Sequence, residues 1–449
     1  MMKKVLLISM FVLNIATAKA QIWSVLGGVN GFQANNTIYS ICSDASGNIY
    51  AGGEFTNSSG KQYVAKWNGS GWTSTGGLSL QANSLIYTLC AGPTGNIYAA
   101  GYFTNASGYS YVARFNGTSW AELGGVNGLR ANTIIRSIFS DASGNIYASG
   151  DFTDSLGSCY VAKYNGTSWS PLGGQGALAT GLNIHSICGD ASGNVYAAGY
   201  IMNANGKKYV AKWNGTSWSE LGGANGISAN DGILSICSDA TGNIYAAGDF
   251  TNASGKHYVA KWDGSAWSEL GGLNALSANG GIRQVYCDAT GNVYAAGYFT
   301  NTANKQYVAK YNGTSWTELG GLNGLSANSG IFGLCTDPSG NTYAGGIFQN
   351  TSGFFYVAKC SAPVSVSDLN LNLDNFVYPN PTTSNFIIEM DNHENIIAEV
   401  YAITGQLIYR QELMSNKTEL NTEDYVSGCY TLKLIRNNEI VATQKLMKY

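Results

Sequence analysis

Residues 239–262 read DATGNIYAAGDFTNASGKHYVAKW, and versions of this stretch recur along most of the 449-residue chain. Gly-Asn-Ile-Tyr or a close variant marks one part of the stretch, and Tyr-Val-Ala-Lys or Tyr-Val-Ala-Arg marks another. Each signature occurs seven times, at steps of 48 or 49 residues, which predicts an architecture of seven repeats. The first signature begins at Gly47, Gly95, Gly144, Gly193, Gly242, Gly291 and Gly340.

Each repeat divides into four extended segments, which in the second repeat are residues 86–90, 96–103, 111–115 and 119–123. The Asp-x-Ser/Thr-Gly-Asn sequence between the first two places glycine where a type I turn with a following bulge needs a positive φ. The composition, with 58 Gly, 6 Pro and 11% charged residues, also suits short strands joined by glycine turns. Four short strands per repeat indicate a propeller blade, although a stacked solenoid also has a repeating core.

The ends of the array separate these two architectures. A tryptophan marks the fourth segment of each repeat, but one copy, Trp23, precedes the first repeat, and the last repeat stops near Cys360 without a fourth segment. Residues 22–27 are therefore expected to pair with residues 356–359 and complete the last blade, which removes exposed strand edges. The predicted fold is all-β, a seven-bladed β-propeller closed by its N-terminal strand. The other copies are Trp72, Trp120, Trp169, Trp218, Trp267 and Trp316.

Several side chains repeat so regularly that packing is their expected role. All ten tryptophans fall at two repeat positions, which predicts contacts between blades. The lysine or arginine of the second signature is expected to pair across strands with Glu122, Glu220, Glu269 and Glu318. One further position holds Phe139, Tyr286 or cysteine, so we expect its cysteines to be buried free thiols rather than disulfides or metal ligands. These cysteines are Cys42, Cys90, Cys188, Cys237 and Cys335.

The N-terminus has the pattern of a secretory signal peptide over residues 1–20. Lys3 and Lys4 precede an apolar run over residues 5–15, and small residues lead to a cleavage site after Ala20. No later stretch has the roughly 18 consecutive apolar residues of a transmembrane segment. Residues 21–361 contain almost equal numbers of basic and acidic side chains, so nucleic acid, which requires a basic surface, is not an expected partner.

Two resemblances follow from these motifs. The stretch 213–222, WNGTSWSELG, with the turn DATGNIY at 239–245, resembles secreted Trp-rich, kelch-like β-propeller repeats, which share a fold more than an activity. Residues 377–449 resemble the type A C-terminal sorting domain of type IX secretion cargo in the Bacteroidetes. The landmarks are Tyr378, Pro379, Asn380 and Pro381, then Gly405 in VYAITGQ, then Gly428 and Tyr430 in GCYTL, with a basic end that includes Lys445.

The second resemblance implies a destination and a domain order. It implies passage through the outer membrane by the type IX secretion machinery after export from the cytoplasm, removal of the tail, and release or surface attachment of the propeller. Residues 21–361 are then the propeller, residues 362–376 a linker, and residues 377–449 the sorting domain. Independently, alternating apolar residues over 386–390, 399–401 and 430–434 predict a small antiparallel β-sandwich for this tail.

No catalytic motif is present, and neither a metal nor a cofactor is expected. A ligand site is better sought where the repeats disagree. One position of the first strand is variable, whereas the residue before it is isoleucine in all seven repeats. We expect these variable residues to form a rim at one mouth of the central channel, suited to an anionic or hydroxyl-rich ligand, unless they merely fill gaps between unequal blades. They are Tyr39, Tyr87, Arg136, His185, Leu234, Arg283 and Phe332.

Asparagines are frequent in the two loops that should lie on the same face as this rim. Their amides could bind sugars, but asparagine also favours turns by bonding its own backbone. Asn132 and Asn230 are the candidate ligand residues, within a series that also includes Asn35, Asn83, Asn279 and Asn328.

The favoured function is a secreted or cell-surface binding module, carbohydrate-binding or adhesive, without catalysis. The alternatives are a hydrolase or lyase acting on polysaccharide at the channel mouth and a structural spacer of the cell envelope. An enzyme would need a carboxylate near the rim, and the candidates are Glu54, Asp151, Asp231 and Asp249.

Overall fold

The computed structural model describes residues 21–28, 31–75, 80–178, 183–224, 226–362, 377–390, 393, 395–436 and 439–449. These residues belong to two compact units, one up to Ala362 and one from Val377 onward. The expected signal peptide, and nearly all of the expected linker, lie outside the described residues. Among the described residues, no helix has the length and apolar character needed to cross a membrane.

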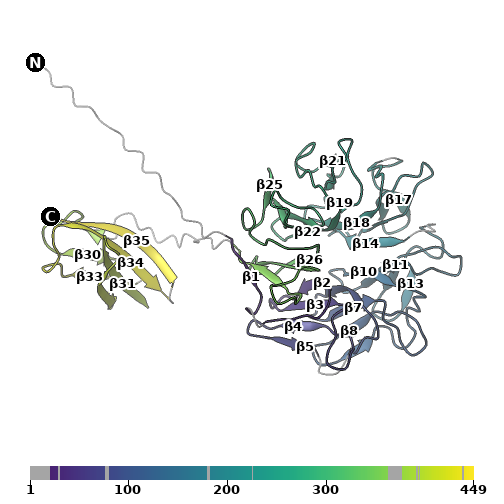
Figure 1. The fold of residues 1–449 in the computed structure, drawn as a ribbon, viewed down its shortest axis with the longest axis horizontal. Helices are drawn as coiled ribbons and strands as arrows, with labels where there is room; N and C mark the ends of the chain where they lie inside the picture. The colour runs from purple at the N-terminus through teal and green to yellow at the C-terminus, as the bar shows by residue number, and fades with distance from the viewer. Residues whose placement is uncertain are drawn as a thin grey trace, which may run out of the picture. The chain divides into compact units, whose positions relative to one another are not determined.

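The first unit consists of seven four-stranded antiparallel sheets, which confirms the predicted seven-bladed β-propeller. In Figure 1 these sheets surround a common centre, with inner strands such as β14, β18 and β22 nearest to it. The first three blades are β2 (Ile38–Ser43), β3 (Ile49–Gly53), β4 (Ala65–Trp67) and β5 (Trp72–Ser74); β6 (Ile86–Ala91), β7 (Ile97–Gly101), β8 (Ala113–Phe115) and β9 (Trp120–Glu122); and β10 (Ile135–Ser140), β11 (Ile146–Gly150), β12 (Ala162–Tyr164) and β13 (Trp169–Pro171).

The next three blades have the same order of strands. They are β14 (Ile184–Gly189), β15 (Val195–Gly199), β16 (Ala211–Trp213) and β17 (Trp218–Glu220); β18 (Ile233–Ser238), β19 (Ile244–Gly248), β20 (Ala260–Trp262) and β21 (Trp267–Glu269); and β22 (Ile282–Cys287), β23 (Val293–Gly297), β24 (Ala309–Tyr311) and β25 (Trp316–Glu318).

The last blade joins the two ends of the propeller sequence. It contains β26 (Ile331–Thr336), β27 (Thr342–Gly346), β28 (Ala358–Cys360) and, as its outer strand, β1 (Trp23–Val25). The antiparallel register pairs Trp23 with Cys360 and Val25 with Ala358. The predicted ring closure is therefore confirmed, and all seven outer strands begin with tryptophan.

Adjacent blades are linked by the repeated tryptophans. The Trp267 indole Nε1 donates a 3.0 Å hydrogen bond to the carbonyl of Leu221, which belongs to the preceding blade, and Trp316 does the same to Leu270 at 3.0 Å. Trp23 closes the ring with a 2.8 Å bond to Leu319. These bonds satisfy the one polar group of each indole while its ring packs, so the predicted role between blades is confirmed.

The turn between the first two strands of a blade is held by an aspartate. In the fifth blade, Asp239 accepts hydrogen bonds from the backbone N–H groups of Thr241 and Asn243, from the Asn243 amide at 2.7 Å and from the Tyr245 hydroxyl at 3.0 Å. Burial acts against ionisation of Asp239, but these bonds outweigh it and lower the pKa of the carboxyl. Gly242 has a φ of 86°, as the turn type requires.

The predicted pairing of lysine with glutamate across strands is wrong. Lys261 pairs in register with Ser268 and lies over the Tyr245 ring, 5.9 Å from its centroid. Glu269 is the next residue of the outer strand and therefore points to the other face. There it accepts a 3.1 Å hydrogen bond from Asn252. The prediction failed because it treated neighbouring residues of one strand as if their side chains shared a face.

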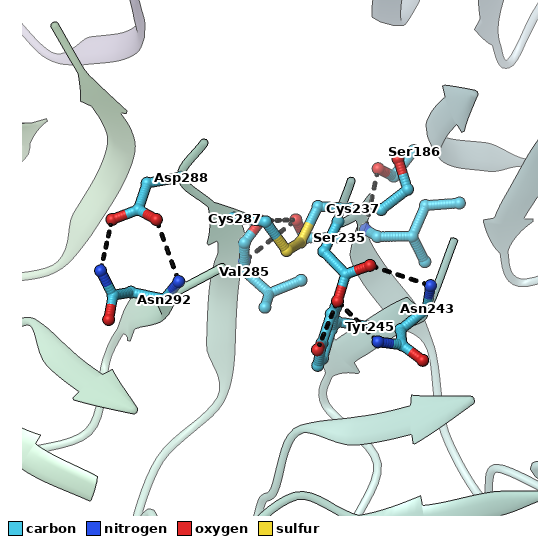
Figure 2. Close-up of a disulfide and its surroundings, with 12 residues drawn as sticks. Ser186, Ser235, Cys237, Asn243, Tyr245, Val285, Cys287, Asp288 and Asn292 are labelled. Atoms are coloured by element: carbon cyan, nitrogen blue, oxygen red, sulfur yellow. Dashed lines mark hydrogen bonds between the residues drawn. A yellow bond between two sulfur atoms is a disulfide. The ribbon is translucent and has the colours of Figure 1, made fainter. Parts of the chain in front are cut away.

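The prediction that the cysteines are free is wrong for one member of the series. Cys237 near the end of β18 forms a disulfide with Cys287 at the end of β22, which connects the inner strands of two adjacent blades (Figure 2). The sequence comparison missed it because Cys287 lies one position beyond the repeated cysteine site. Cys42, Cys90, Cys188 and Cys335 are free thiols, as predicted, and burial raises the pKa of each.

The C-terminal unit is a small antiparallel β-sandwich, as predicted. One sheet contains β29 (Val377–Tyr378), β30 (Phe386–Glu389) and β33 (Lys417–Leu420). The other contains β31 (Ile396–Ala402), β32 (Leu407–Glu412), β34 (Gly428–Arg436) and β35 (Glu439–Lys448). Both sheets contribute to one core, in which Phe386, Val400 and Leu432 are fully buried.

Candidate functional site at the channel mouth

The inner strands of all seven blades surround a cavity of about 120 Å³. Its lining includes the second residue of every inner strand, so the variable positions singled out in the sequence do meet in space. These are Tyr39, Tyr87, Arg136, His185, Leu234, Arg283 and Phe332.

A β-bulge aims each of these side chains. In the fifth blade Ile233 pairs with Gly248 and Ser235 with Ala247, which leaves Leu234 without a partner in the ladder. The same register shift occurs in all seven inner strands. The bulge brings the facing strand so close that a Cβ on Gly248 would lie 2.1 Å from the carbonyl oxygen of Gly232, so only glycine fits.

Three aromatic rings form a continuous row on one side of the mouth. Tyr39 stacks on Tyr87 with a centroid distance of 5.3 Å and on Phe332 with a centroid distance of 5.9 Å. The row spans the last, first and second blades. Burial, aided by the charge of Glu54 and by a 3.4 Å hydrogen bond to it, raises the pKa of Tyr39 to about 12, so its hydroxyl stays protonated.

The two arginines of the rim differ in their partners. Arg136 makes a bidentate salt bridge to Asp151, with Nε–Oδ1 and Nη2–Oδ2 distances of 2.6 Å and 2.7 Å. Arg283 donates instead to the Tyr87 hydroxyl at 3.1 Å and lies over the Phe332 ring, 5.5 Å from its centroid. The described residues give Arg283 no salt bridge. Its charge is therefore the less compensated of the two.

His185 is neutral at physiological pH. Burial and the positive charges of Arg136 and Arg283 lower its pKa to about 4. Its ring meets Tyr200 edge-on at a centroid distance of 5.4 Å. A neutral imidazole keeps one N–H donor and one acceptor nitrogen without adding charge to the mouth.

A second ring of residues, which follows the glycine at the end of each second strand, was largely missed in the sequence. Over six consecutive blades it alternates between a carboxylate and a tyrosine. Tyr102 and Tyr298 are 52% and 46% exposed, which is high for tyrosine. The signal available in the sequence was the variable residue between the recurring glycine and the following Phe or Ile. The ring is Glu54, Tyr102, Asp151, Tyr200, Asp249, Tyr298 and Ile347.

Two of the candidate carboxylates lie close together beside the fifth blade. Burial raises the pKa of Asp249, an effect that Arg283 opposes and Asp231 reinforces. Asp231 accepts a 2.7 Å hydrogen bond from the backbone N–H of Gly232. A Cβ on Gly281 would lie 2.5 Å from Asp249 Oδ1, so the carboxyl packs against the start of the sixth blade.

Hydroxyl groups one position further along the inner strands were also missed. The Oγ atoms of Ser40, Ser137, Ser186 and Ser235 each accept a hydrogen bond from a backbone N–H of the next blade, at 3.0 to 3.2 Å. All four serines line the cavity. They therefore connect adjacent blades and form the floor of the cavity, below the variable residues.

The loop asparagines are engaged within the chain. The Asn230 amide donates to Thr251 Oγ1 at 3.0 Å, and its oxygen accepts from the Thr251 backbone N–H at 2.8 Å. Asn132 makes the same pair of bonds with Thr153, both at 3.0 Å. Neither asparagine lines the channel-mouth cavity. Their role in ligand binding stays a prediction, while their role in holding two loops together is observed.

Two of the three landmarks of the tail contact the last strand of the sandwich. Asn380 donates to the carbonyl of Lys445 at 2.6 Å and accepts from the backbone N–H of Met447 at 2.9 Å. Its neighbours Tyr378, Pro379 and Pro381 flank this contact. Gly405 has a φ of 84° in the turn between β31 and β32, Gly428 begins β34, and the buried Tyr430 bonds to the Val426 carbonyl at 2.6 Å.

Comparison with known proteins agrees with both units. Residues 376–449 match the secretion system C-terminal sorting domain family. A 72-residue stretch is 31% identical to ulvan lyase NLR42 of Nonlabens ulvanivorans, but it covers only 16% of this chain and 14% of that protein. So short a match carries no activity across.

Solved propeller structures share the fold at low sequence identity. PorZ, an essential surface component of the type IX secretion system of Porphyromonas gingivalis, aligns at 13% identity with a TM-score of 0.52, over 94% of this chain and 60% of PorZ. The extracellular domain of BT3049 from B. thetaiotaomicron, described as a hybrid two-component system, aligns at 12% identity with a TM-score of 0.50, over 96% of this chain and 57% of that one. This chain thus spans less than two thirds of either structure.

The sorting-domain match fixes the destination of the chain. Its residues coincide with the C-terminal β-sandwich, and the propeller precedes it. The sandwich is a secretion system C-terminal sorting domain, and the chain is a β-propeller protein exported by the type IX secretion system to the cell surface or the extracellular space.

Proposed function

We propose that the propeller is a carbohydrate-binding module that acts on the outside of the cell, where it can serve adhesion. The observation that carries this proposal is the exposed Tyr102 and Tyr298 in a ring that alternates tyrosine with carboxylate around the channel mouth. Exposed tyrosines offer flat apolar faces at a low cost in side-chain entropy, and their hydroxyls can hydrogen-bond.

The chemistry of the mouth suits a ligand with many hydroxyl groups. A sugar ring has apolar faces, which stack on tyrosine, and equatorial hydroxyls, which carboxylates and amides bind. The blades hold the mouth rigidly, because four of the seven inner strands are hydrogen-bonded to the next blade through a serine. A preorganised surface loses little entropy when a ligand binds.

A screen of purified protein against an array of polysaccharides tests the proposal. Binding should be specific, and the double variant Tyr102→Ala, Tyr298→Ala should weaken it by about ten-fold or more, since stacking contributes roughly 0.5–1.5 kcal/mol per ring beyond burial. The matched control is Tyr449→Ala, which removes a tyrosine that is 65% exposed in the other unit and should leave binding unchanged. Equal binding by all three proteins, or none to any polysaccharide, contradicts the proposal.

A polysaccharide lyase or hydrolase is the second candidate, and specific features of the mouth favour it. The neutral His185 is a base near Arg283, which would neutralise a uronate carboxylate, and Tyr87 is a proton donor. In an elimination, His185 takes the proton from the carbon next to the carboxylate, and the electron pair of that bond forms a carbon–carbon double bond. The bond from the next carbon to the glycosidic oxygen breaks, and this oxygen takes a proton from Tyr87. A hydrolase would instead use Asp249, whose raised pKa suits an acid.

Analysis of any bound polysaccharide for chain shortening separates these two functions. A lyase product absorbs in the ultraviolet because it contains the new double bond, whereas a hydrolase product does not. His185→Ala should abolish elimination. An unshortened polysaccharide after prolonged incubation supports a binding module and excludes both reactions on that substrate.

A further inference from the structure

We infer that the channel-mouth cavity binds an oxyanion, namely the carboxylate or sulfate-ester group of an acidic polysaccharide whose sugar rings rest on the surrounding tyrosines. The inference rests on the proposed function and adds the class of ligand. It follows from what lines the cavity, from the charge at its edge and from its size.

The cavity lining contains hydrogen-bond donors and no carboxylate. The Oγ atoms of Ser40, Ser137 and Ser186 accept N–H groups from the neighbouring blade, and the described residues offer their hydroxyl hydrogens no acceptor. These hydrogens can therefore point into the cavity. A group of convergent O–H donors matches an anion with several oxygens, and the lining offers a cation no carboxylate.

The charge at the cavity comes from the two arginines. Arg136 is neutralised by Asp151, which lies outside the lining, whereas Arg283 has no salt bridge to any described residue. Arg283 extends from the sixth blade to the Tyr87 hydroxyl of the second blade and so crosses the mouth. The other charged groups nearby, Glu54, Asp231 and Asp249, also lie outside the lining. An anion in the cavity thus meets Arg283 before any carboxylate.

The volume decides which part of a ligand enters. The cavity has a volume of about 120 Å³. Pockets that enclose a whole small molecule begin at about 300 Å³. The cavity is therefore large enough for a carboxylate or sulfate ester and small for a sugar ring, so we place the ring at the mouth, at the level of Tyr102 and Tyr298.

Inorganic sulfate is a direct probe of the cavity. With ionic strength held constant by sodium chloride, sulfate should raise the thermal stability of the protein in a saturable way, because a ligand of the folded state shifts the unfolding equilibrium. Arg283→Gln should weaken the apparent affinity by ten-fold or more. Arg114→Gln is the matched control, since it makes the same change at an exposed position of β8 and should leave the affinity unchanged.

Two further variants keep the test decisive if Arg283→Gln fails to fold. Arg283→Lys retains the charge but loses the planar donor pair, and Ser186→Ala removes one floor hydroxyl. Each should weaken sulfate binding two-fold to ten-fold. A sulfate effect that rises without saturation, equally in the original protein and in all the variants, is a solvent effect and overturns the inference.

Calorimetry with three polysaccharides separates this inference from the proposed function. Carrageenan carries sulfate esters, polygalacturonate carries carboxylates, and dextran carries neither. Binding to an acidic polysaccharide at least ten-fold tighter than to dextran, lost in Arg283→Gln, supports both proposals. Equal binding to all three that is lost in Tyr102→Ala, Tyr298→Ala retains the carbohydrate-binding function and overturns the anion site. Saturable binding of sulfate without binding of any polysaccharide retains the anion site and overturns the carbohydrate-binding function.

Discussion

The first two strands of each blade form a hairpin, and its two ends differ in how much their residues vary among the blades. At the turn end, six blades carry the same aspartate, and its bonds to asparagine and tyrosine repeat with nearly the same lengths. At the mouth end, the corresponding residues include tyrosine, arginine, histidine, leucine and phenylalanine. The residues at the turn end are therefore those that a blade needs in order to fold, whereas the residues at the mouth end are those that this protein presents to a ligand.

The physical reason for the difference is the bulge. A side chain that alternates regularly along a strand must fit the space between two blades, so few residue types are accepted there. The bulged residue lies outside the ladder and points toward the channel, where its size is less constrained. A site can thus be built from seven positions without disturbing the packing on which the fold depends.

Removing the turn aspartate should have the largest effect on stability. Asp239→Ala deletes an acceptor of several charged hydrogen bonds and leaves the buried Tyr245 without its partner, so we expect a loss of about 3 kcal/mol in the free energy of unfolding. Urea unfolding followed by circular dichroism measures it. Tyr245→Phe, which removes one of these bonds, should cost only about 1 kcal/mol. A loss of less than about 1 kcal/mol for Asp239→Ala would mean that the turn end contributes little to the stability of the fold.

The mouth should be the more sensitive of the two ends to mild acid. Because the pKa of His185 is about 4 in the folded protein and the ordinary value is about 6.5, the unfolded chain binds a proton first as the pH falls. Stability from this group is present above pH 6.5 and is lost between pH 6.5 and 4, by roughly 2 kcal/mol after allowing for partial exposure.

The effect of His185 must be separated from that of the carboxylates. The turn aspartates Asp44, Asp190, Asp239 and Asp288 have lowered pKa values and lose their contribution in acid as well. The difference between the original protein and His185→Gln, measured by urea unfolding at pH 7, 5.5 and 4, isolates the histidine. Parallel curves for the two proteins would show that the imidazole is freely protonated in the folded state.

The two arginines of the mouth should differ in how much they contribute to stability. Arg136→Ala leaves Asp151 without its bidentate partner in a setting where both side chains are about one-fifth exposed, so we expect a loss of about 1–2 kcal/mol. Arg283→Ala removes a bond to one neutral hydroxyl and should cost less than about 1 kcal/mol. Thermal unfolding of both variants measures the difference. The reverse order would mean that Arg283 is a structural residue rather than one kept for a ligand.

What the sequence could predict follows the same division. The period, the glycine turns and the displaced Trp23 were enough for the seven blades and the closure of the ring, because each is a local pattern repeated many times. The variable rim was also found, since departure from a repeat is visible in one sequence. The ring with Tyr102 and Tyr298 was largely missed, although its position also varies among the repeats, because only the strand pairing shows that the residue after each second strand lies beside the bulged residue of the inner strand. The Cys237–Cys287 disulfide was missed for a similar reason, because it joins positions out of register.

The smallest expected effect on stability comes from Asn230. This residue lies on the mouth side of its blade, but its position is asparagine in most repeats. Asn230 holds the loop at Thr251 with two hydrogen bonds on an exposed surface, so Asn230→Ala should cost about 1 kcal/mol or less. Thr251 engages the amide oxygen and one N–H of Asn230, so only one N–H is left for a ligand. Glycan affinity should therefore change less than two-fold in Asn230→Ala, whereas Tyr102→Ala, Tyr298→Ala should weaken it by about ten-fold or more. Asn132→Ala, which breaks the same pair of bonds in the third blade, is the matched control. Loss of binding in Asn230→Ala but not in Asn132→Ala would make Asn230 a ligand residue. The ligand site would then include the loops as well as the bulged residues of the inner strands.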